Sequence, residues 1–281
     1  MTMPDANEAT QHSLNTERHW SELVNQVAVV TGATGWLGNP ISLGLAHSGA
    51  SVVITSRSPE KLNVLARTIK DLGHKAFPIK CDLTVREDVE SLVEKVQEEF
   101  GRLDILVNNA VSVLSTNSND DFSDLVRQSG ENLSTVWQII EVATQLLKDT
   151  AQRYGDASII NIASMYGKIS PDHRIYENSS TEPNPIFYGT SKAGIIQMTR
   201  WLACKLGPFA IRVNSVSPGP FPRQDLIASN SEFGRLLEIR SPLGRIGRPN
   251  EISGVVTFLA SQGATYITGA DIAVDGGWTS W

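Results

Sequence analysis

Short apolar runs rich in β-branched residues recur along the chain, and longer segments of mixed apolar and polar periodicity separate them. The runs are typical of buried strands, and the segments between them are typical of amphipathic helices. This alternation predicts a parallel sheet covered by helices on both faces, and hence an α/β fold formed by a single doubly wound domain. The strands are predicted at residues 27–31, 51–55, 76–80, 105–107, 158–162, 211–216 and 272–274.

The helices between these strands are predicted to begin near Pro59, Arg86, Asn132 and Asn250. Acidic residues lie in several of these first turns, as the helix dipole prefers. Ligand sites in sheets of this kind lie beyond the carboxyl ends of the strands. We therefore expect functional residues in the connections that follow the strands.

A glycine-rich turn directly follows the first predicted strand, at residues 31–38 with the sequence Thr-Gly-Ala-Thr-Gly-Trp-Leu-Gly. Gly32 can adopt a positive φ, Gly35 lets a pyrophosphate approach the backbone, and Gly38 lets the next helix pack against the strand. The N-terminus of that helix would face the anion. Pro40 is compatible with a helix that begins near Trp36, because amides of the first turn have no intrahelical acceptor. The arrangement predicts a dinucleotide site, although three glycines could also form a plain turn.

Tyr188 and Lys192 are four residues apart and share one face of a predicted helix. A free phenol titrates near pH ~10 and is a poor base at neutral pH, but a nearby ammonium group favours the phenolate and lowers the phenol pKa. The two residues are therefore a candidate acid/base pair, with a chance pairing on a helix as the simpler interpretation.

Further motifs follow in order along the chain. Together with the glycine turn and the Tyr188/Lys192 pair, they resemble the short-chain dehydrogenase/reductase family from about Asn25 onward. The resemblance implies a Rossmann-type domain of about seven parallel strands over residues 25–281. It also implies an NAD(P)-dependent oxidoreductase that interconverts a carbonyl and a secondary alcohol by hydride transfer, assembled as a homotetramer or homodimer. The motifs are Asp82-Leu83, Asn108-Asn109-Ala110, Asn132, 161–164, 214–219 and 274–278.

Four catalytic residues are implied by the resemblance. Tyr188 would exchange a proton with the substrate oxygen, and Ser164 would hydrogen-bond the same oxygen. Lys192 would lower the pKa of the tyrosine and hold the nicotinamide ribose, and Asn132 would position a water that continues the proton path. The simpler interpretations are that Ser164 ends a strand and that Asn132 caps a helix.

The residues expected to bind the cofactor follow the ends of the predicted strands. NADP(H) is favoured over NAD(H), because Arg57 suits a 2′-phosphate and residues 55–58 contain no acid that would repel one. A solvated surface arginine is the alternative. The cofactor-binding set implied by the resemblance is Gly32, Thr34, Gly35, Trp36, Leu37, Ser56, Arg57, Asp82, Leu83, Asn109, Ala110, Tyr188, Lys192, Pro218 and Gly219.

Several positions depart from the common family pattern. Trp36 replaces a glycine, so the glycine spacing is closer to that of extended members that modify nucleotide sugars, and an epimerase or dehydratase is an alternative function. The ending 275–277, Asp-Gly-Gly, favours the single-domain form. Val111 replaces the glycine that usually follows Asn-Asn-Ala. The sequence Pro-Phe-Pro at 220–222 leaves no threonine to contact the carboxamide.

Two variable segments are expected to border the substrate, residues 165–187 and 219–241. The first is longer than in the common family arrangement. Its residues Asp172, His173, Arg174 and Tyr176 could bind a hydroxyl-rich or anionic substrate, or belong to a solvated loop or subunit contact. Mixed polar and apolar walls suggest a sugar, polyol or sugar acid, with a ketoacyl thioester less favoured. The second segment is expected to place Phe221, Leu226, Ile227, Phe233, Leu236 and Leu237 over the nicotinamide.

Composition narrows these interpretations. The chain has 281 residues, 41% of them hydrophobic, which is enough for one substantial core. A net charge of −6 argues against general affinity for nucleic acid. Cys81 and Cys204 show no spacing typical of a metal site, and no metal is predicted. Residues 1–24 lack signal-peptide features and no apolar run is long enough for a membrane span, so we expect a flexible tail, no membrane partner and a cytoplasmic location.

A non-catalytic protein that senses dinucleotides is the alternative outside enzymology. Such a protein is expected to have lost part of the catalytic set, since a fold alone does not prove a function. Ser164, Tyr188 and Lys192 are all present in this chain. An enzyme that acts on a small-molecule carbonyl or alcohol is therefore favoured.

Overall fold

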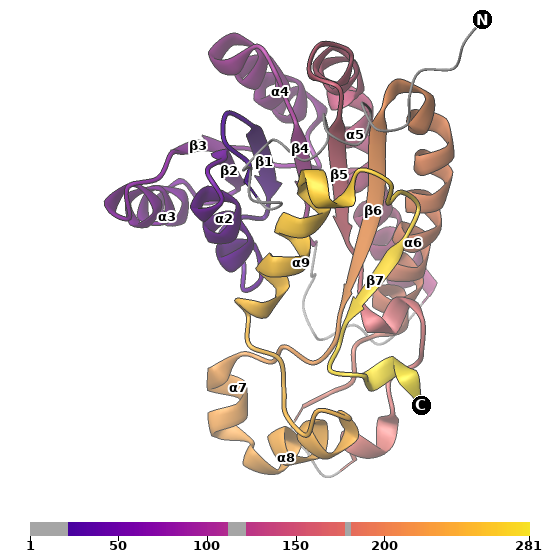
Figure 1. The fold of residues 1–281 in the computed structure, drawn as a ribbon. Helices are drawn as coiled ribbons and strands as arrows, with labels where there is room; N and C mark the ends of the chain where they lie inside the picture. Colours follow the sequence, from indigo (N-terminus) through magenta and orange to yellow (C-terminus); the bar gives the residue numbers. More distant parts are fainter. Residues whose placement is uncertain (1–21, 112–121, 178–180) are drawn as a thin grey trace, which may run out of the picture.

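The computed structural model describes residues 22–111, 122–177 and 181–281. A seven-stranded parallel sheet forms its centre, with the strand order β3-β2-β1-β4-β5-β6-β7 (Figure 1). The predicted doubly wound α/β fold is confirmed. The strands are β1 (Val27–Thr31), β2 (Ser51–Ser56), β3 (Ala76–Lys80), β4 (Ile105–Asn108), β5 (Ala157–Ile162), β6 (Ile211–Pro218) and β7 (Asp271–Val274).

Helices cover both faces of this sheet (Figure 1). On one face, α4 (Arg86–Phe100), α5 (Phe122–Tyr154) and α6 (Ile186–Leu206) share an apolar core with the sheet. On the other face, α2 (Gly38–His47), α3 (Pro59–Asp71) and α9 (Glu251–Ala260) share a second core. The remaining helices are α7 (Gln224–Ser229), α8 (Ser231–Arg240) and the 3-10 helices η1 (Met165–Gly167), η2 (His173–Ile175), η3 (Gly207–Phe209), η4 (Gln262–Ala264) and η5 (Trp278–Ser280).

Successive side chains of the central strands enter opposite cores. In β1, Val29 belongs to the core under α4, α5 and α6, whereas Val30 belongs to the core under α2, α3 and α9. All five residues of β1 are buried, as are all six of β5. Because water reaches neither face, these strands are apolar or small-residue runs without a polar alternation, except for Asn161 of β5, whose buried amide is hydrogen-bonded to Asn108 and Thr199. None of the helices in the described ranges has an apolar stretch long enough to cross a membrane.

Helix α5 begins ten residues before its predicted start. It starts at Phe122, so Asn132 lies inside the helix and the interpretation of Asn132 as a helix cap is wrong. Contact with α6 stabilises the extra turns: the Ser129 hydroxyl lies 3.2 Å from the Thr190 hydroxyl of that helix. Gly130 and the polar residues around it gave a weak local signal, and the tertiary contact overrode it.

The packed domain extends slightly beyond the predicted start at residue 25. Leu23 is fully buried in the core beneath α2, and its backbone N–H donates to the Ser48 carbonyl at 2.7 Å. Residues 1–21 of the expected tail lie outside the described part of the chain. The last residues of that segment are therefore part of the domain.

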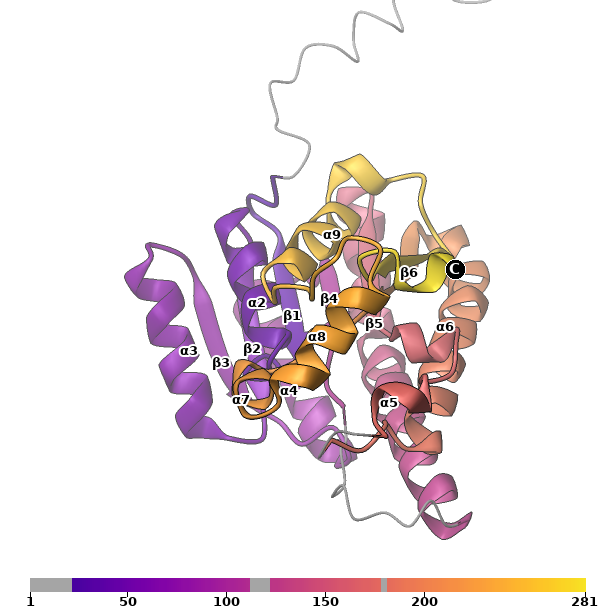
Figure 2. The same cartoon turned by 90° about the horizontal axis from the view of Figure 1, so that it is seen from below.

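Both variable segments lie beyond the carboxyl ends of the strands. Seen from that end, α7 and α8 run across the sheet, with the 165–177 segment beside them (Figure 2). A third apolar cluster joins these segments to the C-terminal η5, and its buried members are Met165, Tyr166, Ile175, Phe233, Leu237 and Trp278. The two segments therefore form one structure beyond the carboxyl ends of the strands. The direction of strand order reverses between β1 and β4, where sheets of this kind bind ligands.

Candidate active site

A cavity of about 820 Å³ occupies the carboxyl ends of the strands, within the range of small-molecule sites. It extends from Arg57 and Asp82 after β2 and β3 to the two variable segments. Every residue predicted to bind the cofactor lines this cavity, together with Ser164. The structure therefore brings together, in one site, residues that are spread from position 32 to position 219.

The glycine turn has the geometry of a phosphate cradle. Gly32 has a φ of +60°, a conformation that favours glycine. A Cβ atom on Gly38 would lie 2.2 Å from the Gly32 carbonyl oxygen, so only glycine fits there. Helix α2 begins at Gly38, two residues after the predicted start, and Pro40 lies in its first turn. The turn therefore leaves backbone amides at a helix N-terminus for a pyrophosphate, and these residues fit a dinucleotide.

Asn109 holds this turn against β4. Its Nδ2 donates to the carbonyl oxygens of Thr31 and Gly32 at 3.1 and 3.0 Å. The Thr31 hydroxyl in turn accepts hydrogen bonds from the backbone N–H groups of Asn109 and Ala110. Asn109 thus positions the turn, and both Asn109 and Ala110 line the cavity.

The far end of the cavity is lined by Arg57, Ser58, Lys61 and Asp82. Arg57 is exposed after β2, and Ser58 caps α3 by accepting a hydrogen bond from the Lys61 backbone N–H. Burial raises the pKa of Asp82, but hydrogen bonds from Thr84 and the charge of Arg57 outweigh it, so the pKa lies below its ordinary value. The cationic side chains of Arg57 and Lys61 therefore border the place where the adenosine ribose of a dinucleotide would lie.

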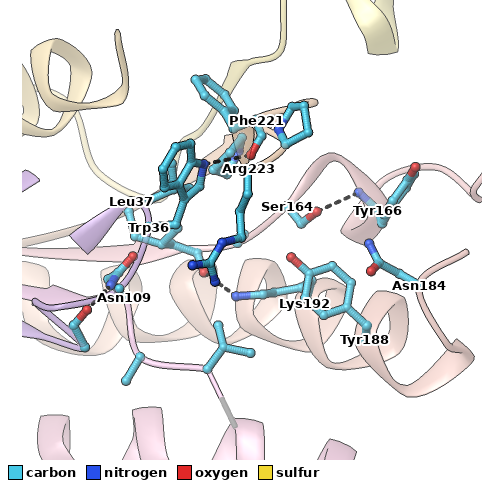
Figure 3. Close-up of a pocket in the computed structure, with 18 of the residues that line it drawn as sticks. Trp36, Leu37, Asn109, Ser164, Tyr166, Asn184, Tyr188, Lys192, Phe221 and Arg223 are labelled. Carbon is cyan, nitrogen blue, oxygen red and sulfur yellow. Dashed lines mark hydrogen bonds between the residues drawn. The ribbon is translucent and has the colours of Figure 1, made fainter. Parts of the chain in front are cut away.

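Lys192 is 2% exposed and its ammonium group faces the cavity (Figure 3). Nζ donates to the Ile162 carbonyl oxygen at 2.7 Å and lies 5.7 Å from the centre of the Tyr188 ring. Burial lowers the pKa of Lys192 to about 8. One of the three ammonium protons is donated to the Ile162 carbonyl oxygen of β5, so the other two can be donated to groups in the cavity.

Tyr188 and Ser164 meet on the same wall. Burial raises the pKa of the half-buried Tyr188, and a hydrogen bond with the Ser164 hydroxyl opposes that shift. The phenol is therefore protonated at neutral pH. Ser164 follows β5 and accepts a hydrogen bond from the Tyr166 backbone N–H at 3.1 Å.

Asn132, the fourth predicted catalytic residue, does not line the cavity with these three. It is 4% exposed inside α5, and the cavity is lined instead by Thr135, one helical turn further along. The Thr135 hydroxyl contacts the Asn132 carbonyl oxygen at 3.4 Å. The water-positioning role of Asn132 remains a prediction.

The 219–241 segment forms an apolar wall of the cavity. Of the six apolar residues expected there, Phe221, Leu226, Phe233 and Leu237 line the cavity. Ile227 and Leu236 pack instead against the third apolar cluster. Leu226, Phe233 and Leu237 also contact that cluster, so one set of side chains supports the fold and forms the wall.

Within the 165–187 segment, the structure selects one of the four candidate residues. Tyr176 lines the cavity, whereas Asp172, His173 and Arg174 do not. Arg174 donates to the Asp172 carboxylate at 2.8 Å through both Nε and Nη2, so its guanidinium group forms an ion pair within the same turn. Arg223 of the 219–241 segment, which the sequence did not indicate, also lines the cavity, and its side chain extends toward Lys192 (Figure 3).

Trp36 joins two walls of the cavity. Its indole Nε1 donates to the Phe221 carbonyl oxygen at 2.9 Å, across 185 positions of sequence (Figure 3). The Phe221 ring packs on Gly247, where a Cβ would lie 2.5 Å from Cε1 of the ring. A tryptophan in place of the usual glycine therefore connects the phosphate turn to the segment that forms the substrate wall.

Several residues that line the cavity were not predicted from the sequence. One of them could have been found from a sequence pattern, and the others could not. Lys61 follows Arg57 by four positions and could have been found from the expected phosphate contact. Tyr166, Asn184 and Arg223 lie in loops or short helices, where no periodicity indicates which side chains face inward.

Comparisons with known proteins agree with this geometry. A family model described as enoyl-(acyl carrier protein) reductase matches residues 32–279. The chain is 34% identical over 260 residues to 3-oxoacyl-(acyl-carrier-protein) reductase FabG of Thermotoga maritima, covering 91% of this chain and 98% of that protein.

Two solved structures are also similar. A complex of Pseudomonas aeruginosa RhlG with NADP shares 31% identity with a TM-score of 0.80, covering 93% of this chain and 99% of that one. A gluconate 5-dehydrogenase from Burkholderia cenocepacia, in complex with NADP and tartrate, shares 27% identity with a TM-score of 0.79, covering 93% and 98%. The chain thus belongs to the short-chain dehydrogenase/reductase family and is an NAD(P)-dependent oxidoreductase.

Proposed function

We propose that this protein interconverts a ketone and a secondary alcohol, with Tyr188 as the acid in the direction of reduction. The observation that carries the proposal is the meeting of Ser164, Tyr188 and Lys192 on one wall of the cavity whose other end is the glycine turn. A bound dinucleotide would supply or accept the hydride at its nicotinamide ring. The chain's own residues supply the proton and the positioning.

In reduction, the substrate oxygen takes a proton from the Tyr188 hydroxyl while the Ser164 hydroxyl donates a hydrogen bond to the same oxygen. Burial, which raises the pKa of Tyr188, keeps the phenol in the protonated form that this step needs. The Lys192 ammonium group stabilises the phenolate that results, because it is held near the ring by the Ile162 carbonyl. Asn132 would position a water that returns the proton.

The substrate class that fits the cavity is a hydroxylated ketone or keto acid of the sugar or polyol type. Arg223 is largely exposed, and its contact with Asp225 is long at 3.7 Å, so the guanidinium group can bind a carboxylate. The apolar wall of Phe221, Leu226 and Phe233 would cover the carbon skeleton. The structural relative solved with tartrate, a hydroxylated dicarboxylate, supports this class.

Purified protein with NADPH is expected to reduce at least one hydroxylated ketone or keto acid. Loss of NADPH absorbance would be followed with keto-sugars, keto sugar acids, simple alkyl ketones and ketoacyl thioesters. Turnover that is confined to the thioesters would contradict the proposed substrate class. Binding of NADPH with no turnover on any ketone would contradict the proposed reaction.

Arg57 and Lys61 support a preference for NADP(H) over NAD(H). Both cations border the cavity after β2, and residues 55–58 contain no carboxylate. Replacing Arg57 with alanine is expected to raise KM for NADPH about 10- to 100-fold, because a charge-assisted contact with the 2′-phosphate is lost. KM for NADH should change by less than about threefold, since that cofactor has no phosphate there. Steady-state kinetics with both cofactors measures the difference.

Arg67→Ala is the matched control for this variant. Arg67 is an exposed arginine on α3 that does not line the cavity, so its removal makes the same change in net charge. An equal effect of Arg57→Ala on both cofactors, or an equal effect of the two variants on NADPH, would contradict a 2′-phosphate contact.

Assembly into a homotetramer or homodimer through α5 and α6 is part of the proposal. Large apolar side chains stand exposed on these two helices, namely Phe122 (79% exposed), Val126, Ile186 and Trp201. Exposed apolar surface of this kind is typical of protein interfaces. Because α6 carries both Tyr188 and Lys192, such a contact would also support the catalytic wall.

A further inference from the structure

We infer that Tyr176, oriented by Tyr166, donates a hydrogen bond to an oxygen substituent next to the substrate carbonyl, and so selects hydroxylated ketones over alkyl ketones. This inference rests on the proposed function and deepens it. Both phenols line the cavity, and their hydroxyl oxygens lie 2.9 Å apart. Tyr176 belongs to the 165–187 segment, one of the two variable segments expected to border the substrate.

The phenol pair is held firmly relative to the catalytic helix. Tyr166 lies in η1, two residues after Ser164, and is 7% exposed. Helix η1 touches α6 closely: a Cβ on Gly167 would lie 2.8 Å from the Lys192 carbonyl carbon, and one on Gly189 would lie 3.0 Å from the Tyr166 carbonyl oxygen. Glycine at both positions therefore lets η1 press against the helix that carries Tyr188 and Lys192.

Tyr176 is fixed from the other side by the apolar wall. Its ring packs on Phe233 of α8, with ring centroids 5.3 Å apart and an interplanar angle of 48°. The preceding residue, Ile175, is buried in the third apolar cluster, and Asp172 caps η2 by accepting a hydrogen bond from the Arg174 backbone N–H. The Tyr176 hydroxyl is thus placed by packing that does not depend on a substrate.

Proton counting shows that the pair has a donor to spare. Burial raises the pKa of both phenols, so both are protonated at neutral pH. Two hydroxyls carry two protons, and a single contact between their oxygens uses one. Tyr166 is the more buried of the two phenols, and when it donates across the 2.9 Å contact the Tyr176 proton is the one left over. The Tyr176 proton is therefore available to the cavity.

The apolar side chains around the Tyr176 hydroxyl make its hydrogen bond selective for substrates that carry an acceptor oxygen. Leu226, Phe233 and Leu237 pack in one cluster with Tyr176 and offer no side-chain acceptor. Glu182 and Asn184 also line the cavity, but within the described residues Tyr166 is the hydrogen-bond partner of the Tyr176 hydroxyl. When a substrate fills the site and excludes water, a hydroxyl without an acceptor is costly, and a site built to hydrogen-bond a substrate oxygen rejects analogues that lack it. A ketone with a neighbouring hydroxyl satisfies the donor, and an alkyl ketone of the same shape does not.

Hydroxyacetone and butanone test this selection, because they differ only in a hydroxyl against a methyl group beside the carbonyl. The wild-type protein is expected to show a kcat/KM about tenfold or more higher for hydroxyacetone. Tyr176→Phe keeps the ring that packs on Phe233 and removes the hydroxyl. It is expected to bring the ratio close to one, through a higher KM for hydroxyacetone, and to leave butanone unchanged.

Two further variants separate this contact from a structural role. Tyr166→Phe removes only the orienting partner and is expected to lower the ratio partially, by about threefold. Tyr266→Phe, at a fully exposed residue, is expected to leave it unchanged. Thermal melts check that all variants are folded. A fall in activity of Tyr176→Phe that is equal on both ketones would indicate a structural role and overturn the inference.

The remaining outcomes also decide the matter. A wild-type ratio near one, retention of a high ratio in Tyr176→Phe, or failure to reduce hydroxyacetone while other ketones react would overturn the inference alone. Absence of turnover on every ketone would overturn the proposed function, and the inference with it.

Discussion

Replacing Tyr188 with phenylalanine is expected to lower kcat by about 10²- to 10⁴-fold, while NADPH still binds with a Kd within about twofold of the wild type. A positioned acid contributes roughly 10²- to 10⁴-fold to a rate, and the phenol is the proton donor for the substrate oxygen in the proposed mechanism. The ring remains in the variant, so the packing of the catalytic wall is kept. Single-turnover kinetics and fluorescence titration measure the two quantities separately.

The large effect depends on the position of this hydroxyl. Ser164 hydrogen-bonds to it, and the Lys192 ammonium group lies 5.7 Å from the ring centre. Tyr266→Phe removes a hydroxyl from a fully exposed residue and should leave kcat unchanged. If Tyr188→Phe kept more than about a tenth of the wild-type kcat, another group would have to be the acid.

Replacing Gly38 with alanine is expected to lower the free energy of unfolding by roughly 2–3 kcal/mol and to weaken NADPH binding more than tenfold. The added Cβ would lie 2.2 Å from the Gly32 carbonyl oxygen and 2.7 Å from Nδ2 of Asn109. Neither group can move freely, since Gly32 forms the tight turn and Asn109 is bonded to it. The turn must open, and the backbone amides that would face the pyrophosphate then lose their geometry.

Gly254→Ala is the matched control for the loss of a helical glycine. Gly254 lies within α9, and a Cβ there would meet nothing within 4 Å. Alanine should therefore stabilise that helix by about 0.5–1 kcal/mol and leave NADPH binding unchanged. Urea denaturation and cofactor titration of both variants give the comparison. Equal stability and affinity in the two variants would show that the turn tolerates a side chain at Gly38.

The strands were largely predictable because their burial is simple. A strand covered on both faces needs apolar or small residues at every position, and runs of this kind are visible without any knowledge of the fold. The predicted range 27–31 coincides with β1, and 211–216 ends two residues before the end of β6. Start signals of helices were less reliable, as α5 shows, because contact with α6 supports turns that the local sequence favours only weakly.

The residues of the candidate site likewise divide into those that the sequence predicts and those that it does not. The dinucleotide residues follow strand ends in a regular fold, so each motif has a defined place along the edge of the sheet. The substrate wall comes from loops and short helices, where the direction of a side chain depends on packing. Arg174 was a candidate from sequence, yet it pairs with Asp172, and Arg223 faces the cavity instead.

The sequence by itself determined that the chain forms a doubly wound α/β sheet with a glycine turn, a Tyr188/Lys192 pair and an unusually long segment between Ser164 and Tyr188. The first three features follow from local periodicity, glycine spacing and helical spacing, all of which act over a few residues, and the length of the segment is unusual by comparison with the family it resembles. Only the tertiary structure decided that Trp36 bonds to Phe221 and that Tyr166 and Tyr176 share a hydrogen bond in the cavity. Such contacts depend on how separate segments pack over the ends of the strands, and packing between distant segments leaves no period in the chain.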